Sequence, residues 1–282
     1  MIQPVRKGRE LLDEIDNEAA QTPVLWWLGQ SGFVVKYRRI VFYLDPYLSE
    51  SLTKKYGNTN RPHIRMTEAP FRGEDVIHAD LVFSTHGHSD HLDPGTVPAI
   101  LASSPEARLV LPKALVEKAC AMGVPSERMR PTDAGDVIEF RKDGAVATIH
   151  PIPSAHEQLD WTPESGYPYL GYVIRFGEWT IYQPGDCVPY DVLVERLRPF
   201  GVTVALLPVN GRDPARGVAG NFSISEAAQL AEDIGARWLI PAHYDMFTFN
   251  TVAIGLFVEH MKIRPSQNFK ILRCGERWVV PR

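Results

Sequence analysis

Cysteine is scarce in this sequence, and its scarcity argues against one class of protein. The 282 residues include only Cys120, Cys187 and Cys274, which are odd in number and show no paired spacing. A disulfide framework needs an even set of cysteines at regular spacings. We therefore expect the thiols to stay reduced, which fits a cytoplasmic protein.

An excess of positive charge is also missing. Lysine and arginine together number 30 and aspartate and glutamate 34, so the net charge is −4. A chain with this balance creates no global field that attracts nucleic acid. A nucleic-acid partner is therefore not expected, although a local basic patch stays open.

Long apolar runs are absent as well. No stretch approaches the roughly 20 apolar residues that a membrane-spanning helix needs. The first 20 residues include early basic residues but no apolar core region, so they do not resemble a secretory signal. We expect no membrane partner, and we read Leu11, Leu12 and Ile15 as the apolar face of a short helix.

The residues that are present predict an α/β fold. Helical patterns cover residues 113–123 and 223–235, and Ser223 and Glu226 fit a capping box at the start of the second. A β meander comes first, helices and strands then alternate, and a β-rich stretch restarts the pattern from about Ala145. We expect one domain over residues 1–282, built as a four-layer α/β/β/α sandwich. The expected strands are short apolar runs, of which examples are VLWWLG, FVVKY, IVFYLDP, DLVFSTH, RLVLP, AVATIHPI, YLGYVIRF, WTIYQPGD, VALLPVN and RWLIPAH.

Histidine clusters in one short segment. Nine histidines occur in the chain, and His86, His88 and His91 fall within six residues together with Asp90. If the segment leaves its strand extended, His86 and His88 project to the same side and reach one metal ion. Asp90 and His91 follow after the chain turns and reach a second ion. The alternative is a polar loop of capping residues.

Three further residues complete a candidate metal-binding set. His156, Asp186 and His243 each follow an apolar run, at the carboxyl end where open α/β sheets place their ligands. Any one of them alone is more typical of an ordinary loop residue. Together the chain offers each of two ions three or four ligands and leaves a position for water. The predicted metal ligands are His86, His88, Asp90, His91, His156, Asp186 and His243.

These segments resemble the metallo-β-lactamase superfamily. The likeness rests on STHGHSDHLDP, on GD at Asp186, on PAHYD at His243, and on the early WLGQSGFVVKY and YLDPYL. Within the superfamily, the segments at His86 and His243 are similar to the L-ascorbate-6-phosphate lactonase branch. The resemblance implies a four-layer fold and a binuclear site.

The resemblance also implies roles for the ligands. His86, His88 and His156 would hold one ion, Asp90, His91 and His243 the other, and Asp186 would bridge them. A hydroxide between the ions would attack a carbonyl or phosphoryl centre. We take Asp90 and Asp186 as the catalytic carboxylates. Imidazole and carboxylate ligands admit two divalent ions of zinc, manganese or iron, and the branch favours manganese.

Departures from other members of the superfamily narrow the chemistry. Diiron members carry glutamate where this chain has His88, and this chain has no appended flavodoxin-like half, so redox chemistry is not favoured. Zinc β-lactamases place cysteine at the position of Asp186, and a secreted lactamase would need a signal peptide. We expect Cys187 to be a small buried residue and not a ligand.

Substrate recognition is predicted in a glycine-rich segment after VALLPVN. Asn210, Arg212, Arg216 and Asn221 lie there, and Arg212 suits recognition of phosphate or carboxylate. A solvated surface loop is the alternative. The long segment 154–169 is expected to be a functional loop.

We expect supporting roles for the residues next to His243 and no functional role for the remaining histidines. Tyr244 and Asp245 are expected to support the ligand His243. The histidines outside the predicted ligand set are interpreted as structural or surface residues; they are His63, His78, His150 and His260.

Three functions are compatible with this site. The first is a metal-dependent hydrolase of a small anionic ester or lactone, with a sugar-phosphate lactone as one candidate substrate. The second is a phosphodiesterase acting on nucleic acid or phospholipid, which the acidic balance disfavours. The third is a non-catalytic metal-binding scaffold, which the complete ligand set disfavours. We expect a small-molecule partner, and the oligomeric state, a homo-oligomer included, stays open.

Overall fold

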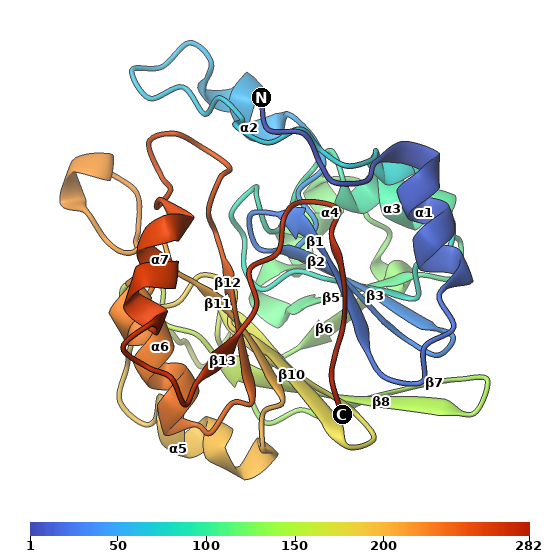
Figure 1. Ribbon diagram of the computed structural model, residues 1–282. Coiled ribbons are helices and arrows are strands. Elements are labelled where there is room, and N and C mark those ends of the chain that lie inside the picture. Colours follow the sequence, from blue (N-terminus) through green and yellow to red (C-terminus); the bar gives the residue numbers. More distant parts are fainter.

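The computed structural model describes residues 1–282 as two seven-stranded sheets packed face to face (Figure 1). The first sheet has the strand order β14-β1-β2-β3-β4-β5-β6, and the second has β13-β12-β11-β10-β9-β8-β7. The first sheet contains β1 (Val24–Gly29), β2 (Gly32–Tyr37), β3 (Ile40–Leu44), β4 (Leu81–Phe83), β5 (Arg108–Pro112), β6 (Met129–Thr132) and β14 (Arg277–Val279). The second contains β7 (Ile138–Lys142), β8 (Ala145–Pro153), β9 (Leu170–Phe176), β10 (Trp179–Gln183), β11 (Val204–Pro208), β12 (Trp238–Ala242) and β13 (Asn268–Phe269).

Helices cover the outer faces of both sheets. In Figure 1, α1 and α3 lie outside the first sheet, and α6 and α7 outside the second. The four-layer α/β/β/α arrangement predicted from the sequence is therefore confirmed. No helix is long and apolar enough to cross a membrane. The helices are α1 (Gly8–Asn17), α2 (Ser51–Tyr56), α3 (Val97–Ser103), α4 (Val116–Ala121), α5 (Leu193–Leu197), α6 (Ile224–Asp233) and α7 (Ile254–Met261).

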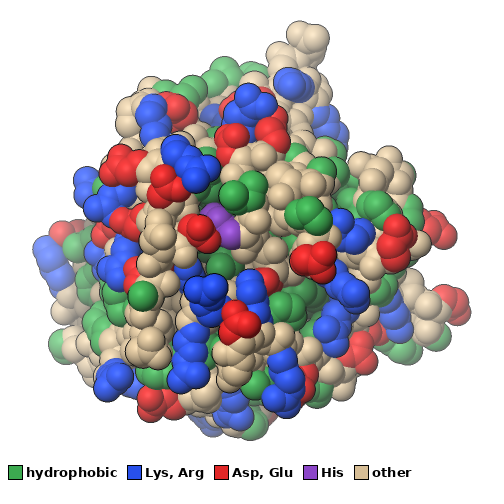
Figure 2. Space-filling view, turned by 90° about the vertical axis from the view of Figure 1, so that its right-hand side faces the viewer, with side chains coloured by type: hydrophobic (Ala, Val, Ile, Leu, Met, Phe, Trp, Pro, Cys, Tyr) green, Lys and Arg blue, Asp and Glu red, His purple; other side chains and the backbone are tan.

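The exterior carries charges of both signs. Figure 2 shows lysine and arginine side chains interspersed with aspartate and glutamate over one face of the molecule. This pattern agrees with the small net charge of −4. The face in Figure 2 therefore lacks the single-sign surface that an extended nucleic-acid footprint requires.

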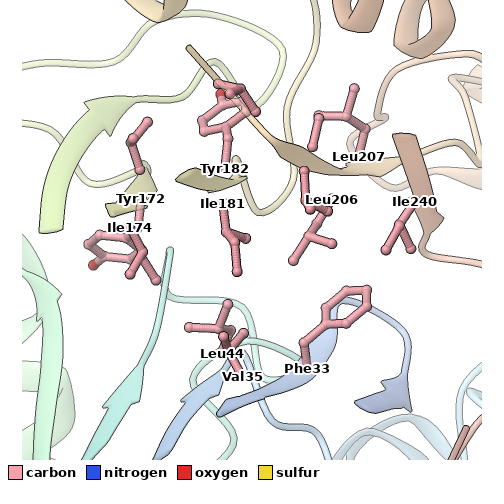
Figure 3. Packing of buried hydrophobic residues seen from close by; sticks show 14 of the residues in the cluster. Phe33, Val35, Leu44, Tyr172, Ile174, Ile181, Tyr182, Leu206, Leu207 and Ile240 are labelled. Atoms are coloured by element: carbon pink, nitrogen blue, oxygen red, sulfur yellow. The ribbon is translucent and has the colours of Figure 1, made fainter. Parts of the chain in front are cut away.

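The main core lies between the sheets. Phe33, Val35 and Leu44 of the first sheet point toward Ile181 and neighbouring residues of the second (Figure 3). Because strand side chains alternate, Tyr182 points the other way, toward the layer of outer helices. Every residue of β1, β2 and β3 is buried, as expected for strands covered on both faces.

Most of the local predictions are confirmed. Leu11, Leu12 and Ile15 form the buried face of α1, and Ser223 and Glu226 form the capping box of α6. The pattern over 113–123 is a 3₁₀ turn, Lys113–Leu115, followed by α4. The strand predicted from about Ala145 is β8, but the strand β7, which precedes it in the second sheet, was not predicted. The strand β7 is an edge strand with only one buried residue, so its apolar pattern is weak.

Candidate metal centre

The structure brings the seven predicted ligands together at one edge of the two sheets. The segment after β4 carries four of them, and the ends of β8, β10 and β12 lead to the other three. Gly185 makes this convergence sterically feasible. Its φ is +68°, and a Cβ there would lie 2.3 Å from Thr85 Oγ1, so only glycine lets the end of β10 approach the end of β4 this closely.

Three imidazoles in one group turn their nitrogens toward a common point. His86 Nε2 lies 3.0 Å from His88 Nδ1, and His88 Nδ1 lies 3.3 Å from His156 Nε2. A neutral imidazole presents a lone pair at one nitrogen, and lone pairs at these distances repel unless a cation or proton lies among them. The arrangement therefore suits a shared ion.

A second group lies beside the first. His91 Nε2 and His243 Nε2 are 3.8 and 4.0 Å from Asp90 Oδ2. Within each group, the atoms that could bind an ion lie within 4.8 Å of one another. His243 adopts a left-handed φ of 63°, a conformation that costs about 1–3 kcal/mol and recurs at functional sites.

The carboxylate of Asp186 lies between the two groups. Its Oδ1 is 3.2 Å from His91 Nε2 and 3.4 Å from His243 Nε2. Its Oδ2 is 3.8 Å from His156 Nε2. One oxygen therefore faces each group, which is the geometry that a bridging carboxylate needs.

The chemistry of these donors fits two divalent ions. Asp186 Oδ1 and His91 Nε2 are buried and have no hydrogen-bond partner. A buried polar atom without a partner is costly, and metal coordination would satisfy both atoms. Imidazole and carboxylate donors without thiolate are compatible with zinc, manganese or iron.

Asp45 orients His91, one of the predicted ligands. This carboxylate follows β3, is fully buried, and accepts a 2.7 Å hydrogen bond from His91 Nδ1. Thr85 adds two more donors to it, the backbone N–H at 2.8 Å and the hydroxyl at 2.7 Å. With Nδ1 protonated and held by Asp45, His91 presents Nε2 to the site. Asp45 lies in the segment YLDPYL, but nothing in that segment alone indicates its role.

Gln30 contacts two ligands of the second group. Its Nε2 donates to Asp90 Oδ2 at 2.8 Å and lies 3.0 Å from His243 Nε2. Its backbone carbonyl accepts from the N–H of His243 at 2.9 Å. Gln30 lies in the segment WLGQSGF, in the turn between β1 and β2. Its position in this turn is the only feature of the sequence that could have indicated its role.

Burial and charge act in opposite directions on the two groups. Burial lowers the pKa of His86 well below its ordinary value, and it also lowers that of His88. Burial acts the same way on His91, but Asp186, Asp45 and Asp90 outweigh it and raise the pKa well above its ordinary value. Burial therefore favours neutral imidazoles at His86 and His88, whereas an unmetallated second group favours a proton on His91.

A cavity of about 250 Å³ opens onto the ligands. His88, His156 and His243 line its base, together with the two carboxylates of the centre. Tyr56, His63, Phe247 and Phe249 form an aromatic wall, with His63 stacked on Tyr56 at 4.2 Å between ring centroids. The cavity is large enough for a small molecule.

The predicted substrate-binding residues lie outside the lining of this cavity. Arg212 pairs with Glu226, and Asn221 accepts a 2.9 Å hydrogen bond from the N–H of Cys187. Asn210 donates to Asn250, and Arg216 donates to the carbonyl of Asn210. A role for Asn210, Arg212 or Asn221 in substrate binding therefore stays a prediction.

The expectations for Tyr244, Asp245, Cys187 and the segment 154–169 differ in how well they agree with the structure. Tyr244 donates to the carbonyl of Leu272 and Asp245 accepts through its backbone from Thr67, so neither side chain is hydrogen-bonded to His243. Cys187 is buried, as expected, and burial raises its pKa to about 12. The segment 154–169 contributes only His156 to the cavity lining.

The remaining histidines separate into two kinds. His78 is hydrogen-bonded to Tyr43 and His150 packs on Phe200, which agrees with structural roles. His260 lies 3.2 Å from the Nε of Arg264 on the exterior of α7. His63 differs, because it lines the cavity, and no local pattern in the sequence indicated that position.

The fold and the site define a class, the metal-dependent hydrolases with an α/β/β/α sandwich. A model of the Beta-lactamase superfamily domain matches residues 41–244, and the chain belongs to this superfamily. A "Probable L-ascorbate-6-phosphate lactonase" from Escherichia fergusonii is 23% identical, over 97% of this chain and 86% of its own length. A metal-dependent hydrolase from Pyrococcus horikoshii is 26% identical, over 78% of this chain and 83% of its own length.

Solved structures show the same fold. A metallo hydrolase from Ignicoccus hospitalis superposes with a TM-score of 0.67 at 19% identity, covering 93% of this chain and 99% of its own. The superfamily resemblance and the fold class predicted from the sequence are thereby confirmed.

Proposed function

We propose that the chain is a binuclear hydrolase of small anionic esters or lactones. In this proposal His86, His88 and His156 hold one divalent ion, Asp90, His91 and His243 hold the other, and Asp186 bridges them. The single observation that carries it is the carboxylate of Asp186, whose two oxygens face two separate groups of imidazoles.

The protein's own groups prepare the site for hydrolysis. The two ligand groups would hold divalent ions, which would supply a hydroxide nucleophile near neutral pH and stabilise negative charge on the carbonyl oxygen. Asp186 sets the spacing of the two ligand groups. Asp90 is held by the amide of Gln30, and its carboxylate would accept a hydrogen bond from the nucleophile and orient it.

Two observations support the substrate class. The cavity of about 250 Å³ is smaller than typical sites for drug-sized ligands, which favours a small metabolite over a polymer. The relative from Escherichia fergusonii, 23% identical, carries the name of a lactonase of a sugar-acid phosphate. A sugar-phosphate lactone is therefore the first substrate to test.

The test combines a substrate screen with ligand variants. The metal-loaded protein is assayed on lactones, thioesters and phosphodiesters, and His86→Ala and His243→Ala are expected to abolish hydrolysis while leaving the circular dichroism spectrum unchanged. His260→Ala, on the exterior of α7, is the matched control. Near-normal turnover in both ligand variants would exclude the binuclear assignment, and turnover of phosphodiesters alone would favour the phosphodiesterase.

A further inference from the structure

Two lysines from distant parts of the chain lie at the same cavity. Lys55 belongs to α2 and Lys118 to α4, and both line the cavity that opens onto the metal centre. Neither was singled out in the sequence, because each is a charged residue of a short helix with no motif around it. Their separation of 118 − 55 = 63 residues leaves no local pattern that joins them.

Lys118 is held against the loop that carries the ligands. Its Nζ donates to the carbonyl of Gly87, the residue between His86 and His88. A Cβ on Gly87 would lie 3.5 Å from Lys118 Nζ and 3.7 Å from its Cδ. The side chain of Lys118 therefore lies against the backbone of this loop. An ammonium group has three donors and no acceptor, so further donors remain for a ligand.

Lys55 approaches the cavity from the side of the aromatic wall. Its Nζ lies 5.0 Å from the ring centroid of Tyr56, which stacks in turn on His63. Lys55 forms no ion pair with a carboxylate. Lys55, Lys118 and His63 all line this one cavity, and the charge of Lys55 contributes, after burial, to lowering the pKa values of the other two.

The cavity lining has a net positive charge if the two carboxylates that would bind metal are not counted. Asp90 and Asp186 are the only acidic residues in the lining, and both belong to the metal centre. No carboxylate of the lining therefore remains to neutralise the two lysines. An anionic ligand would satisfy both ammonium groups.

We propose that Lys55 and Lys118 form a subsite for an anionic group of the substrate, a phosphate monoester or a carboxylate, at a distance from the carbonyl that reacts. The proposal rests on the hydrolase function proposed above, because it places the scissile carbonyl at the metal centre. The aromatic wall lies beside the subsite, and ring faces of this kind pack well against the carbon skeleton that would join the two groups.

Binding of product-like acids tests the subsite without turnover. Affinities of the metal-loaded protein are measured by calorimetry for gluconate, 6-phosphogluconate and glucarate. All three carry one carboxylate that is able to contact the metal centre, and the last two add a phosphate or a carboxylate at the far end. The wild-type protein is expected to prefer one of these two over gluconate by about tenfold or more, and the preferred acid identifies the anion.

Variants assign that preference to the two lysines. Lys55→Gln/Lys118→Gln is expected to abolish the preference and to leave the affinity for gluconate and the metal content unchanged. Lys54→Gln, at a neighbouring lysine of the same helix that does not line the cavity, is the matched control and keeps the preference. Absence of the preference in the wild type, or its persistence in the double variant, would overturn the subsite.

Hydrolysis of gluconolactone and 6-phosphogluconolactone separates this proposal from the function on which it rests. If the lysine-dependent preference is present but no ester or lactone is hydrolysed, the subsite stands and the hydrolase function fails. If lactones are hydrolysed and the preference is absent, the hydrolase function stands and the subsite fails.

Discussion

At the scale of single residues, the buried carboxylate of Asp45 connects the first sheet to the candidate metal centre. It receives three hydrogen bonds from His91 and Thr85 and has no exposed surface. A carboxylate in this position fixes the tautomer of the ligand and increases its basicity. Asp45 is therefore expected to act on metal binding through His91, as a positioning residue.

Substitution of Asp45 tests this role. Asp45→Asn keeps the shape of the side chain but loses the negative charge, and we expect metal affinity to fall by about 10- to 100-fold. Metal content after dialysis against graded chelator concentrations measures the change. Asp245→Asn is the control, because Asp245 is not hydrogen-bonded to a ligand; an equal loss in both variants would contradict the role of Asp45.

Metal uptake at pH 7 is predicted to release a proton from His91. Burial by itself lowers the pKa of this residue, but Asp186, Asp45 and Asp90 raise it well above the ordinary value. The proton on Nε2 therefore has to leave before this nitrogen binds an ion. Metal affinity should fall by up to about tenfold per pH unit below this pKa and level off above it.

Calorimetry checks the proton release. Metal is titrated into the protein at pH 7 in two buffers with different ionisation enthalpies. The account predicts different apparent binding enthalpies in the two buffers. Identical enthalpies would mean that no proton is released and that His91 is already neutral.

At the scale of the elements, the end of β10 has to pass close to the end of β4. Gly185 allows this, whereas an added Cβ would overlap Thr85 Oγ1. Gly185→Ala is expected to destabilise the fold by about 2–4 kcal/mol and to reduce metal content, because Asp186 follows directly.

A second glycine separates backbone strain from steric overlap. Gly201 has a φ of +58° with nothing within 4 Å of an added Cβ, so Gly201→Ala should cost only about 1 kcal/mol. Denaturant unfolding of both variants, with metal analysis, makes the comparison. Equal destabilisation would show that the contact with Thr85 is unimportant.

The elements also explain which features the sequence could predict. The strands that carry ligands were predictable, because each is a buried apolar run followed by a histidine or aspartate. The helix α2 was not, because its six residues SLTKKY bury only Leu52 and have no side-chain cap. The strand β14 was not predictable either. It consists of three half-buried residues near the end of the chain, and they pair with β1 near its start.

The site was predictable only where its pattern is local. His86, His88, Asp90 and His91 lie within six residues, and their spacing carries the chemistry. Asp45 and Gln30 act on ligands 46 and 60 or more residues away, so their roles depend on sheet packing that no single segment encodes. The same reason conceals Lys55 and Lys118, which meet only across the cavity.

At the scale of the whole molecule, one continuous core joins the two sheets. Side chains such as Phe33 and Leu44 pack against Ile181 and Ile240 of the opposite sheet. We predict that residues 1–282 unfold as one domain. Thermal unfolding curves from far-ultraviolet and near-ultraviolet circular dichroism should then coincide, and two separated transitions would indicate independent units.

We propose that seven side chains hold two divalent ions with Asp186 between them. Anomalous X-ray scattering from crystals of the metal-loaded protein would locate these ions. We expect two anomalous peaks, each about 2.0–2.3 Å from its imidazole and carboxylate ligands, with one oxygen of Asp186 on each. A single peak, or two peaks of which neither contacts Asp186, would contradict it.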